Sequence, residues 1–135
     1  MYSLTTSIRV RYAETDQMRG VYNGRYFEYF EVGRAELMRS LGLSYRQFEE
    51  AGFLLPLTEA YAKYIKQIHY DDVIEVVAML KEAPMARLRI DYEILRGSEK
   101  MTEGFTAHSF IEAKSGRPVR APKMFLDLLK KDFEF

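Results

Sequence analysis

A long amphipathic helix followed by a run of strands is the feature that most constrains how this chain folds. Tyr26, Phe30, Leu37 and Leu41 recur at intervals of four and seven residues, which places them on one face of a helix that Gly42 is predicted to end. Such a face must be buried against another layer, and the strands that follow can supply it. The order of these elements predicts an α+β fold rather than alternating strands and helices.

Four segments after the helix have the β-branched, aromatic or alternating composition of strands. In the third, Leu88, Ile90 and Tyr92 alternate with charged residues, so one face is predicted to enter the core and the other to meet water or a charged ligand. Turn signals at 97–98 and 115–116 are expected to join neighbouring strands as antiparallel hairpins. The four segments cover residues 55–64, 73–82, 87–96 and 102–112.

A further strand is expected before the helix, because Ile8, Val10 and Tyr12 alternate with arginines up to about Ala13. Gly33, in the middle of the helix, is interpreted as a close approach of another backbone rather than a break. No repeat, low-complexity tract or linker divides the chain. Residues 1–135 are therefore predicted to form a single domain.

Two short helices are also predicted. Ser44 and Gln47 have the spacing of a capping box, which opens a helix that Gly52 would close. Pro122 is expected to start a last helix carrying Phe125.

Composition excludes several classes of protein. Lys and Arg number 20 and Asp and Glu number 20, so no global basic field attracts nucleic acid or an anionic membrane. Cysteine is absent, which excludes disulfides, thiolate metal sites and a cysteine nucleophile. No apolar stretch approaches the roughly 20 residues of a membrane-spanning helix, and the N-terminus lacks the apolar run of a signal peptide. We expect a cytoplasmic protein with no nucleic-acid partner and no membrane insertion.

Common catalytic signatures are missing as well. The sequence contains no GxGxxG, GxxxxGK[ST], GxSxG or HExxH. His69 and His108 are far apart and lack metal-ligand partners at motif spacing. Neither a metal nor a cofactor is predicted.

The best candidate site is the segment 12–26, which runs from the first strand through a loop into the long helix. Asp16 lies in this loop, and a carboxylate close to a helix N-terminus is near unpaired amides that can bind a developing oxyanion. Acyl transfer needs both a nucleophile or base and such donors. The alternative is that Asp16 is a turn or cap residue and that Asn23 caps the helix.

The motif Y-x-E-T-D-Q-M, followed by G-V-Y-N-G-R-Y-F-E-Y-F-E-x-x-R, closely resembles the opening segment of the 4-hydroxybenzoyl-CoA thioesterase family. That family includes the acyl-CoA thioesterases associated with the Tol-Pal system. The resemblance continues through R-S-L-G at 39–42, A-K-Y-I-K-Q-I-H-Y-D-D-V-I-E-V at 62–76 and S-G-R-P-V-R-A-P at 115–122.

The resemblance implies a hotdog fold, in which an antiparallel sheet of about five strands wraps around one long central helix. It also implies hydrolysis of an acyl-CoA to a free acid and CoA, at sites between the subunits of a homodimer or homotetramer. CoA is then part of the substrate, and no separate cofactor is required.

The resemblance further assigns the site residues. Asp16 matches the catalytic aspartate, as a nucleophile that forms a mixed anhydride or as a general base. The backbone N–H of Asn23 matches the oxyanion contact, and Gly20, Val21 and Tyr22 would bind substrate.

Three positions depart from the family pattern. Asn23 stands where histidine is common, so acid/base help from that side chain is not expected. Arg25 replaces a more usual asparagine, and Gln67 replaces a proline.

The phosphates of CoA require a cationic rim. Arg87, Arg89 and Arg120 are the predicted contributors, with Arg117 and Lys123 on nearby segments. The alternative is ordinary solvated surface charge.

Two other functions compete with thioester hydrolysis. One is a non-catalytic acyl-thioester-binding hotdog module in which Asp16 is structural. The other is a hotdog dehydratase or hydratase, which would require a histidine beside a carboxylate in the site. The long helix and its leading loop contain no histidine, which argues against the latter.

Overall fold

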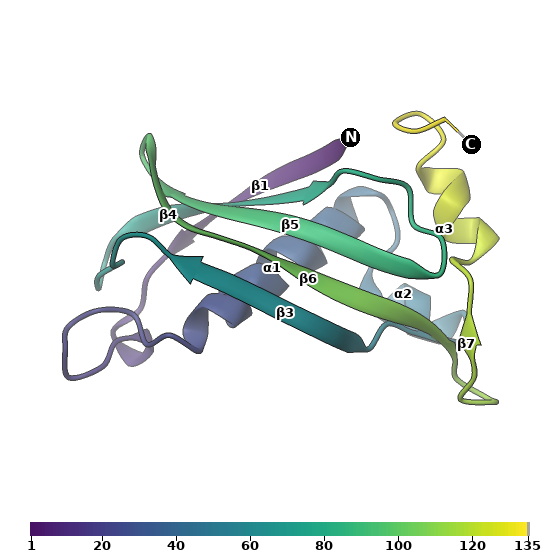
Figure 1. Cartoon of the computed structure of the whole chain (residues 1–135), viewed down its shortest axis with the longest axis horizontal. Coiled ribbons are helices and arrows are strands. Elements are labelled where there is room, and N and C mark those ends of the chain that lie inside the picture. Colours follow the sequence, from purple (N-terminus) through teal and green to yellow (C-terminus); the bar gives the residue numbers. More distant parts are fainter. Residues whose placement is uncertain (135) are drawn as a thin grey trace.

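The computed structural model describes residues 1–134. Five long strands and one long helix dominate it, and short elements complete it (Figure 1). In chain order these are β1 (Tyr2–Arg9), the 3-10 turn η1 (Tyr12–Glu14), α1 (Arg25–Ser40), α2 (Tyr45–Glu50), β2 (Phe53–Leu54), β3 (Leu57–Tyr64), β4 (Val73–Leu80), β5 (Arg87–Arg96), β6 (Glu99–Glu112), β7 (Pro118–Val119) and α3 (Lys123–Leu128).

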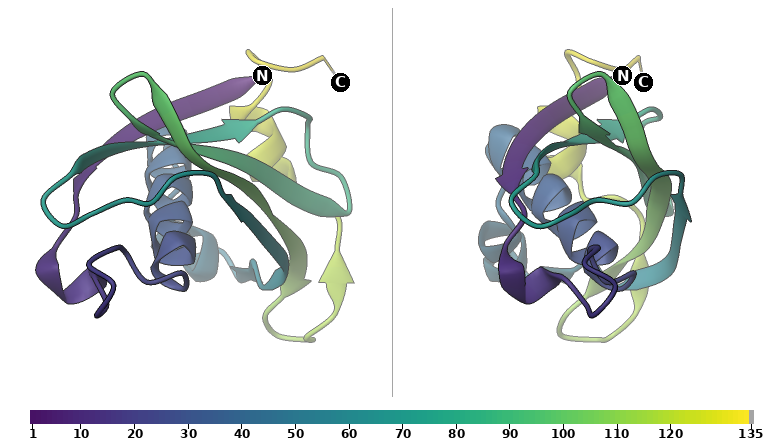
Figure 2. Two further views of the ribbon diagram at one scale, coloured as in Figure 1. Left: turned by 60° about the vertical axis from the view of Figure 1, so that its left-hand side comes forward. Right: turned by 90° about the vertical axis from the view of Figure 1, so that its left-hand side faces the viewer.

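The strands form one antiparallel sheet. Its order is β1-β4-β5-β6-β2, and β3 and β7 also pair with β6. Figure 2 shows the sheet curving around α1. The predicted α+β fold, a sheet of about five long strands wrapped around one helix, is confirmed, with the two-residue strands β2 and β7 added.

The core lies between α1 and the concave face of the sheet. Phe30 of α1 stacks on Tyr92 of β5, with ring centroids 4.4 Å apart and an interplanar angle of 9°. A Cβ on Gly33 would lie only 2.7 Å from Cγ1 of Val76 on β4. The glycine therefore permits a close approach, as predicted, although a side chain of the sheet rather than a backbone makes it.

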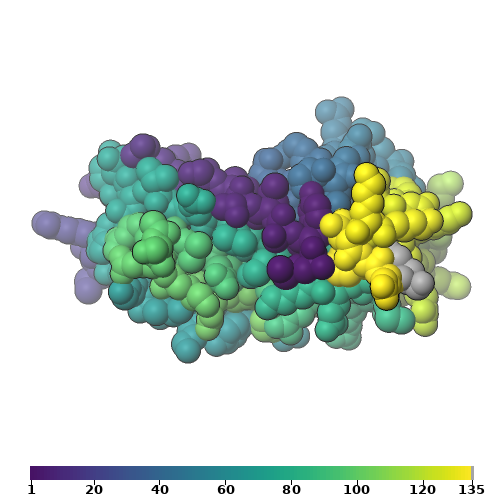
Figure 3. Space-filling view, turned by 90° about the horizontal axis from the view of Figure 1, so that it is seen from above, coloured from purple at the N-terminus to yellow at the C-terminus, as the bar shows by residue number. Residues whose placement is uncertain are grey.

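The short helices close one end of the sheet. Ser44 and Gln47 form the predicted capping box, and Gly52 follows α2 with a φ of 95°. Phe48 of α2 and Phe125 of α3 pack together with ring centroids 6.4 Å apart. The start of β1 lies beside the segment that follows α3 (Figure 3), and the N-terminal ammonium donates to the Asp132 carbonyl at 3.4 Å.

The predicted position of the first strand is wrong. Half-buried residues alternate from Tyr2 to Ile8 in β1, and the strand ends at Arg9 rather than near Ala13. The chain turns into η1 because the Glu14 carboxylate accepts the Arg11 amide at 2.8 Å, which favours a turn over continued extension.

No helix within residues 1–134 is long and apolar enough to cross a membrane. The predicted cytoplasmic location stays a prediction. The same residues contain no cluster of three or more His, Asp or Glu side chains arranged to hold a metal ion.

Candidate active site

Asp16 lies in a tight loop that projects from one end of the molecule between η1 and α1 (Figures 1 and 2). A β-bridge between Thr15 and Val21 closes this loop. Within it, the Asp16 amide donates to the Gly20 carbonyl at 3.0 Å, and the Arg19 amide donates to the Asp16 carbonyl at 3.0 Å. The backbone of Asp16 is therefore held in one conformation.

The Asp16 side chain has both a turn role and access to a cavity. Its Oδ1 accepts the Met18 amide at 2.8 Å, which is the local bond of an Asx turn. No hydrogen bond from residues 1–134 engages Oδ2. The exposed carboxylate lines a cavity of about 390 Å³, and the other lining residues are Tyr12, Thr15, Gln17, Arg19 and Tyr70.

Glu14 anchors the loop to the helix. Its buried carboxylate accepts the Tyr29 hydroxyl at 3.0 Å, and its carbonyl accepts the Tyr22 amide at 3.0 Å. Burial, together with this carboxylate, raises the pKa of Tyr29. No motif or spacing marks Glu14 in the sequence, because only the fold brings the Tyr29 hydroxyl to its carboxylate.

The start of α1 offers free amides. Neither the Asn23 nor the Gly24 N–H has an acceptor within the described chain, and both residues are exposed. The alternative of Asn23 as the helix cap is wrong, because Gly24 holds the N-cap position and no side chain caps it. The Asn23 carbonyl accepts the Tyr64 hydroxyl at 3.0 Å, which joins the end of β3 to the helix start.

A second cavity, of about 220 Å³, lies beside these amides. Val21 and Asn23 line it, together with Gln67, whose side chain lies directly over Gly20. A Cβ on Gly20 would fall 1.7 Å from the Gln67 Nε2, so a side chain at position 20 would displace the Gln67 amide. The remaining lining residues are Tyr26, Tyr64, Ile65 and Lys66.

The structure brings most of the predicted site residues together. Gly20 and Val21 are buried in the loop, where the Val21 amide donates to the Ile68 carbonyl at 2.8 Å. Tyr22 is exposed beside Asn23. Asp16 and Asn23 lie on the same short connection, although they line different cavities.

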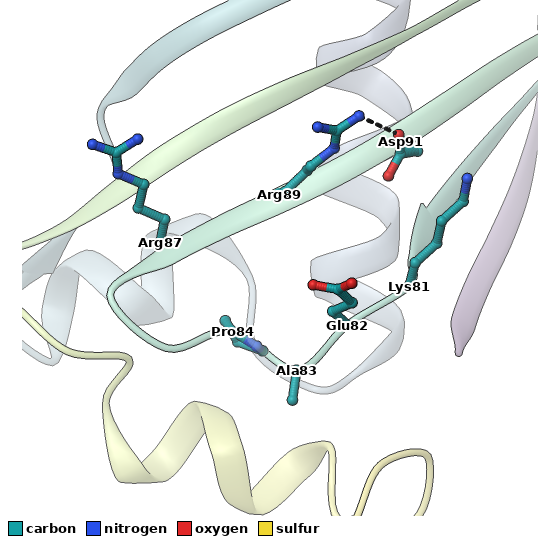
Figure 4. A pocket seen from close by; sticks show the side chains of 7 residues that line it. All are labelled: Lys81, Glu82, Ala83, Pro84, Arg87, Arg89 and Asp91. Carbon is teal, nitrogen blue, oxygen red and sulfur yellow. Dashed lines mark hydrogen bonds and ion pairs between the residues drawn. The ribbon is translucent and has the colours of Figure 1, made fainter.

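The predicted arginines lie elsewhere. Arg87 and Arg89 are on the outer face of β5, where they line a cavity of about 320 Å³ with Lys81 from the segment after β4 (Figure 4). The Arg89 guanidinium lies 3.9 Å from the Phe105 ring centroid and donates to Asp91 at 3.1 Å. Arg120 is exposed after β7.

Within one copy of the folded chain, these arginines and the Asp16 loop lie at opposite ends of the sheet. Arg87 begins β5 at the end of the sheet near α3, whereas the loop lies at the other end (Figure 1). A single copy of the chain therefore does not combine the cationic cluster with Asp16.

Comparison with known proteins agrees with this architecture. The profile of the thioesterase-like superfamily matches residues 10–129. The chain is 30% identical over 128 residues to the YneP protein of Bacillus subtilis, which is named provisionally as an acyl-CoA thioesterase, with 94% of this chain and 93% of that protein covered. It is 25% identical over 117 residues to the acyl-CoA thioesterase YbgC of Haemophilus influenzae, with 86% of each covered.

A solved thioesterase structure has the same fold. The DHNA-CoA thioesterase of Staphylococcus aureus superposes with a TM-score of 0.90 at 31% identity, covering 97% of this chain and 91% of that one. The predicted hotdog fold and the predicted thioesterase class are confirmed. The chain belongs to the thioesterase-like superfamily.

Proposed function

We propose that this chain hydrolyses acyl-CoA thioesters with Asp16 as its catalytic residue. The observation that carries the proposal is the exposed Asp16 carboxylate, which lines a cavity on the loop leading to the free amides of Asn23 and Gly24. Relatives named as acyl-CoA and DHNA-CoA thioesterases support the same class of substrate. The proposed reaction uses no metal or cofactor.

In the proposed reaction the thioester carbonyl oxygen becomes an oxyanion that accepts the Asn23 amide, with the Gly24 amide beside it. Oδ2 of Asp16 is free to act by either of two routes. It adds to the carbonyl carbon, the C–S bond breaks and water then hydrolyses the mixed anhydride, or it takes a proton from water that adds directly. Both routes yield the free acid and the thiol of CoA.

The position of the arginines supports a site completed by a second copy of the chain. In the sheet, Leu57 at the start of β3 pairs with His108, which pairs with Leu88 next to Arg87. The other end of β3, Tyr64, contacts the start of α1. Antiparallel pairing of two β3 edges therefore brings the arginines of one copy toward the Asp16 loop of the other.

We accordingly propose a homodimer formed through β3, alone or doubled into a homotetramer. Arg87 and Arg89 would bind the CoA phosphates at the shared site, with Arg120 at its rim.

A thiol reagent that detects released CoA tests the proposed hydrolysis. Short-chain, long-chain and aromatic acyl-CoAs are compared for the wild type and Asp16→Asn. We expect the variant to lose at least 100-fold in kcat, within the range for removal of a nucleophile or base, while its circular dichroism stays unchanged. Hydrolysis by Asp16→Asn at the wild-type rate excludes a catalytic role and favours the Asx turn as the sole function of Asp16.

A single turnover in ¹⁸O-labelled water identifies the nucleophilic route by label on the Asp16 carboxylate, because general-base catalysis never labels the aspartate. Nucleophilic attack by Asp16 leaves the first-turnover product unlabelled and transfers the label to the aspartate when water attacks the carboxylate side of the anhydride. General-base catalysis labels the product acid directly.

One alternative is a non-catalytic module that binds acyl thioesters, favoured by the turn bond that Asp16 Oδ1 makes. It predicts binding of acyl-CoA without thiol release by the wild type.

A dehydratase finds less support, because His108 is buried under α1 and His69 lines neither cavity beside the loop.

A further inference from the structure

Arg19 has a backbone conformation that residues with a Cβ avoid. Its φ is 65°, in the left-handed region, within the turn that holds Asp16. The other non-glycine residue with positive φ in the described part of the chain is Asp71, at 68°. Gly42, Gly52 and Gly97 take this conformation elsewhere, so a glycine at position 19 would avoid the strain. Backbone strain of this kind clusters at binding and catalytic sites, so the Arg19 side chain is a candidate for binding a ligand.

The Arg19 side chain is exposed to the cavity that Asp16 lines. Arg9, Arg11 and Arg25 on the neighbouring segments each pair with a carboxylate, at 3.3, 3.5 and 3.0 Å respectively. Arg19 forms no ion pair with residues 1–134. Its guanidinium is therefore available for an anion within the cavity.

The rest of the cavity suits an organic group rather than a free ion. Tyr12 and Tyr70 both line it, with ring centroids 5.6 Å apart and an interplanar angle of 57°, and both are largely exposed. Thr15 and Gln17 add polar side chains. The cavity volume of about 390 Å³ accommodates a small acyl group between these aromatic walls and the guanidinium.

We propose that Arg19 selects acyl-CoAs whose acyl group carries a carboxylate. The inference rests on the proposed function, because Asp16 locates the thioester carbonyl. Arg19 and Asp16 share one turn and one cavity, so the guanidinium is close to the reacting carbonyl. The pantetheine arm holds the CoA phosphates far from that carbonyl, which leaves the acyl group as the source of the anion. A planar guanidinium binds carboxylate oxygens with charge-assisted hydrogen bonds.

The test compares glutaryl-CoA with pentanoyl-CoA, which have acyl chains of the same carbon number and differ in the terminal carboxylate. For Arg19→Gly we expect the ratio of kcat/KM for glutaryl-CoA to that for pentanoyl-CoA to fall about tenfold or more. The same variant should unfold at an equal or higher denaturant concentration, because glycine relieves the left-handed backbone. Arg19→Gly is therefore expected to lower the selectivity for glutaryl-CoA while it maintains or raises the stability of the fold.

Asp71→Gly is the matched control, because it also replaces a non-glycine residue of positive φ, outside the residues that line the cavity. The relief of its left-handed backbone should raise stability in the same way, less the small contribution of its exposed pair with Arg9, and the substrate ratio should stay unchanged. Arg19→Asn separates charge from backbone, since asparagine tolerates the left-handed region. It should lose selectivity as Arg19→Gly does.

Glutaryl-pantetheine and pentanoyl-pantetheine, which lack the nucleotide, identify the source of the anion. The inference requires the effect of Arg19→Gly on the substrate ratio to persist with these thioesters. An equal loss for both CoA substrates that disappears with the pantetheine thioesters assigns Arg19 to the phosphates and overturns the inference. An unchanged ratio in a variant that hydrolyses both substrates also overturns it, and leaves the proposed hydrolysis intact.

If the proposed function is wrong, the wild type releases no thiol from any of these thioesters, which distinguishes this outcome from those above. Calorimetric binding of glutaryl-CoA and pentanoyl-CoA to the wild type and Arg19→Gly then decides the selectivity. A preference for glutaryl-CoA that Arg19→Gly abolishes supports the inference, and equal binding of the two thioesters to the wild type overturns it.

Discussion

Glu14 ties the Asp16 loop to α1 through a buried carboxylate with two close donors. Removal of this side chain leaves the Tyr29 hydroxyl and the Arg11 amide without their acceptor. We expect Glu14→Ala to lower the free energy of unfolding by about 2–4 kcal/mol, as for other buried charged hydrogen-bonded groups. Thiol release should fall more steeply in kcat than in KM, since the loop that carries Asp16 loses its anchor. Urea denaturation and steady-state kinetics measure the two effects.

Glu28→Ala is the control for this prediction. Glu28 pairs with Arg25 at 3.0 Å on the exposed surface of α1. Exposed pairs contribute about 0–1 kcal/mol. A loss of stability in Glu28→Ala equal to that in Glu14→Ala contradicts the anchoring role of Glu14.

His108 makes the stability of the fold sensitive to acid. Its Nε2 lies 3.0 Å from the Thr106 hydroxyl, which is 2.6 Å from the Tyr92 hydroxyl, and Arg34 donates to Tyr92 at 3.2 Å. Burial, with a smaller contribution from the Arg34 cation, lowers the pKa of His108 from 6.5 to about 4. The folded state thus holds His108 neutral at a pH where the unfolded chain protonates it.

Between pH 6.5 and about 4 the unfolded state binds more protons, so stability is present above this window and is lost as pH falls through it. We expect the free energy of unfolding to fall by about 2 kcal/mol between pH 7 and pH 5 on account of His108. Denaturant titrations at the two pH values should show a reduced fall in His108→Gln. The fall should persist in His69→Gln, because His69 is exposed.

At the scale of elements, α1 and β4 approach so closely that one methyl group matters. A Cβ at Gly33 would lie 2.7 Å from Val76 Cγ1, so Gly33→Ala forces a shift that costs about 1–3 kcal/mol. The gain in helix propensity offsets about 1 kcal/mol of this. We expect a net loss of stability, measured by urea denaturation.

The clash at Gly33 is tested by a double-mutant cycle. Val76→Ala removes the opposing methyl groups, so its cost should be smaller in the Gly33→Ala background than in the wild type. Additive costs for the two substitutions show that Val76 is not the obstacle.

The elements differ in how far the sequence predicts them. Periodicity located α1 and β5 closely, because each has one buried face with an uninterrupted apolar pattern. Periodicity misplaces β1, because Thr6 occupies an inward position and breaks the apolar pattern. The residues of the Asp16 loop were predicted from the resemblance, but the anchoring of Glu14 by Tyr29 and the left-handed Arg19 depend on backbone geometry that no spacing reveals.

At the scale of the whole molecule, β3 is one exposed edge of the sheet, and β1 is the other edge strand. Leu57, Tyr61 and Tyr64 on this strand are 55%, 49% and 43% exposed, which is unusual for large apolar side chains of one strand. Two β3 strands paired about a twofold axis would cover them. A charge near the middle of β3 then opposes its own copy across the axis.

If the proposed β3 dimer forms, we expect Ala60→Asp to shift it to monomer, with unchanged circular dichroism. Sedimentation or light scattering at several concentrations measures this shift. Ala113→Asp introduces the same charge at an exposed turn away from β3 and should remain dimeric. A wild type that is monomeric and fully active excludes the interface.

A shared site makes a stronger prediction for mixed subunits. Asp16→Asn keeps its arginines, and the double variant Arg87→Ala/Arg89→Ala keeps its aspartate. Should each site combine Asp16 of one copy with the arginines of the other, a heterodimer of these two impaired chains contains one intact site. Random exchange then restores about a quarter of the wild-type thiol release, because half of the dimers are mixed and each has one of its two sites complete. At subsaturating acyl-CoA the unmixed variants should keep their low rates, and no recovery after verified subunit exchange means that Asp16 and the arginines do not act together across the interface.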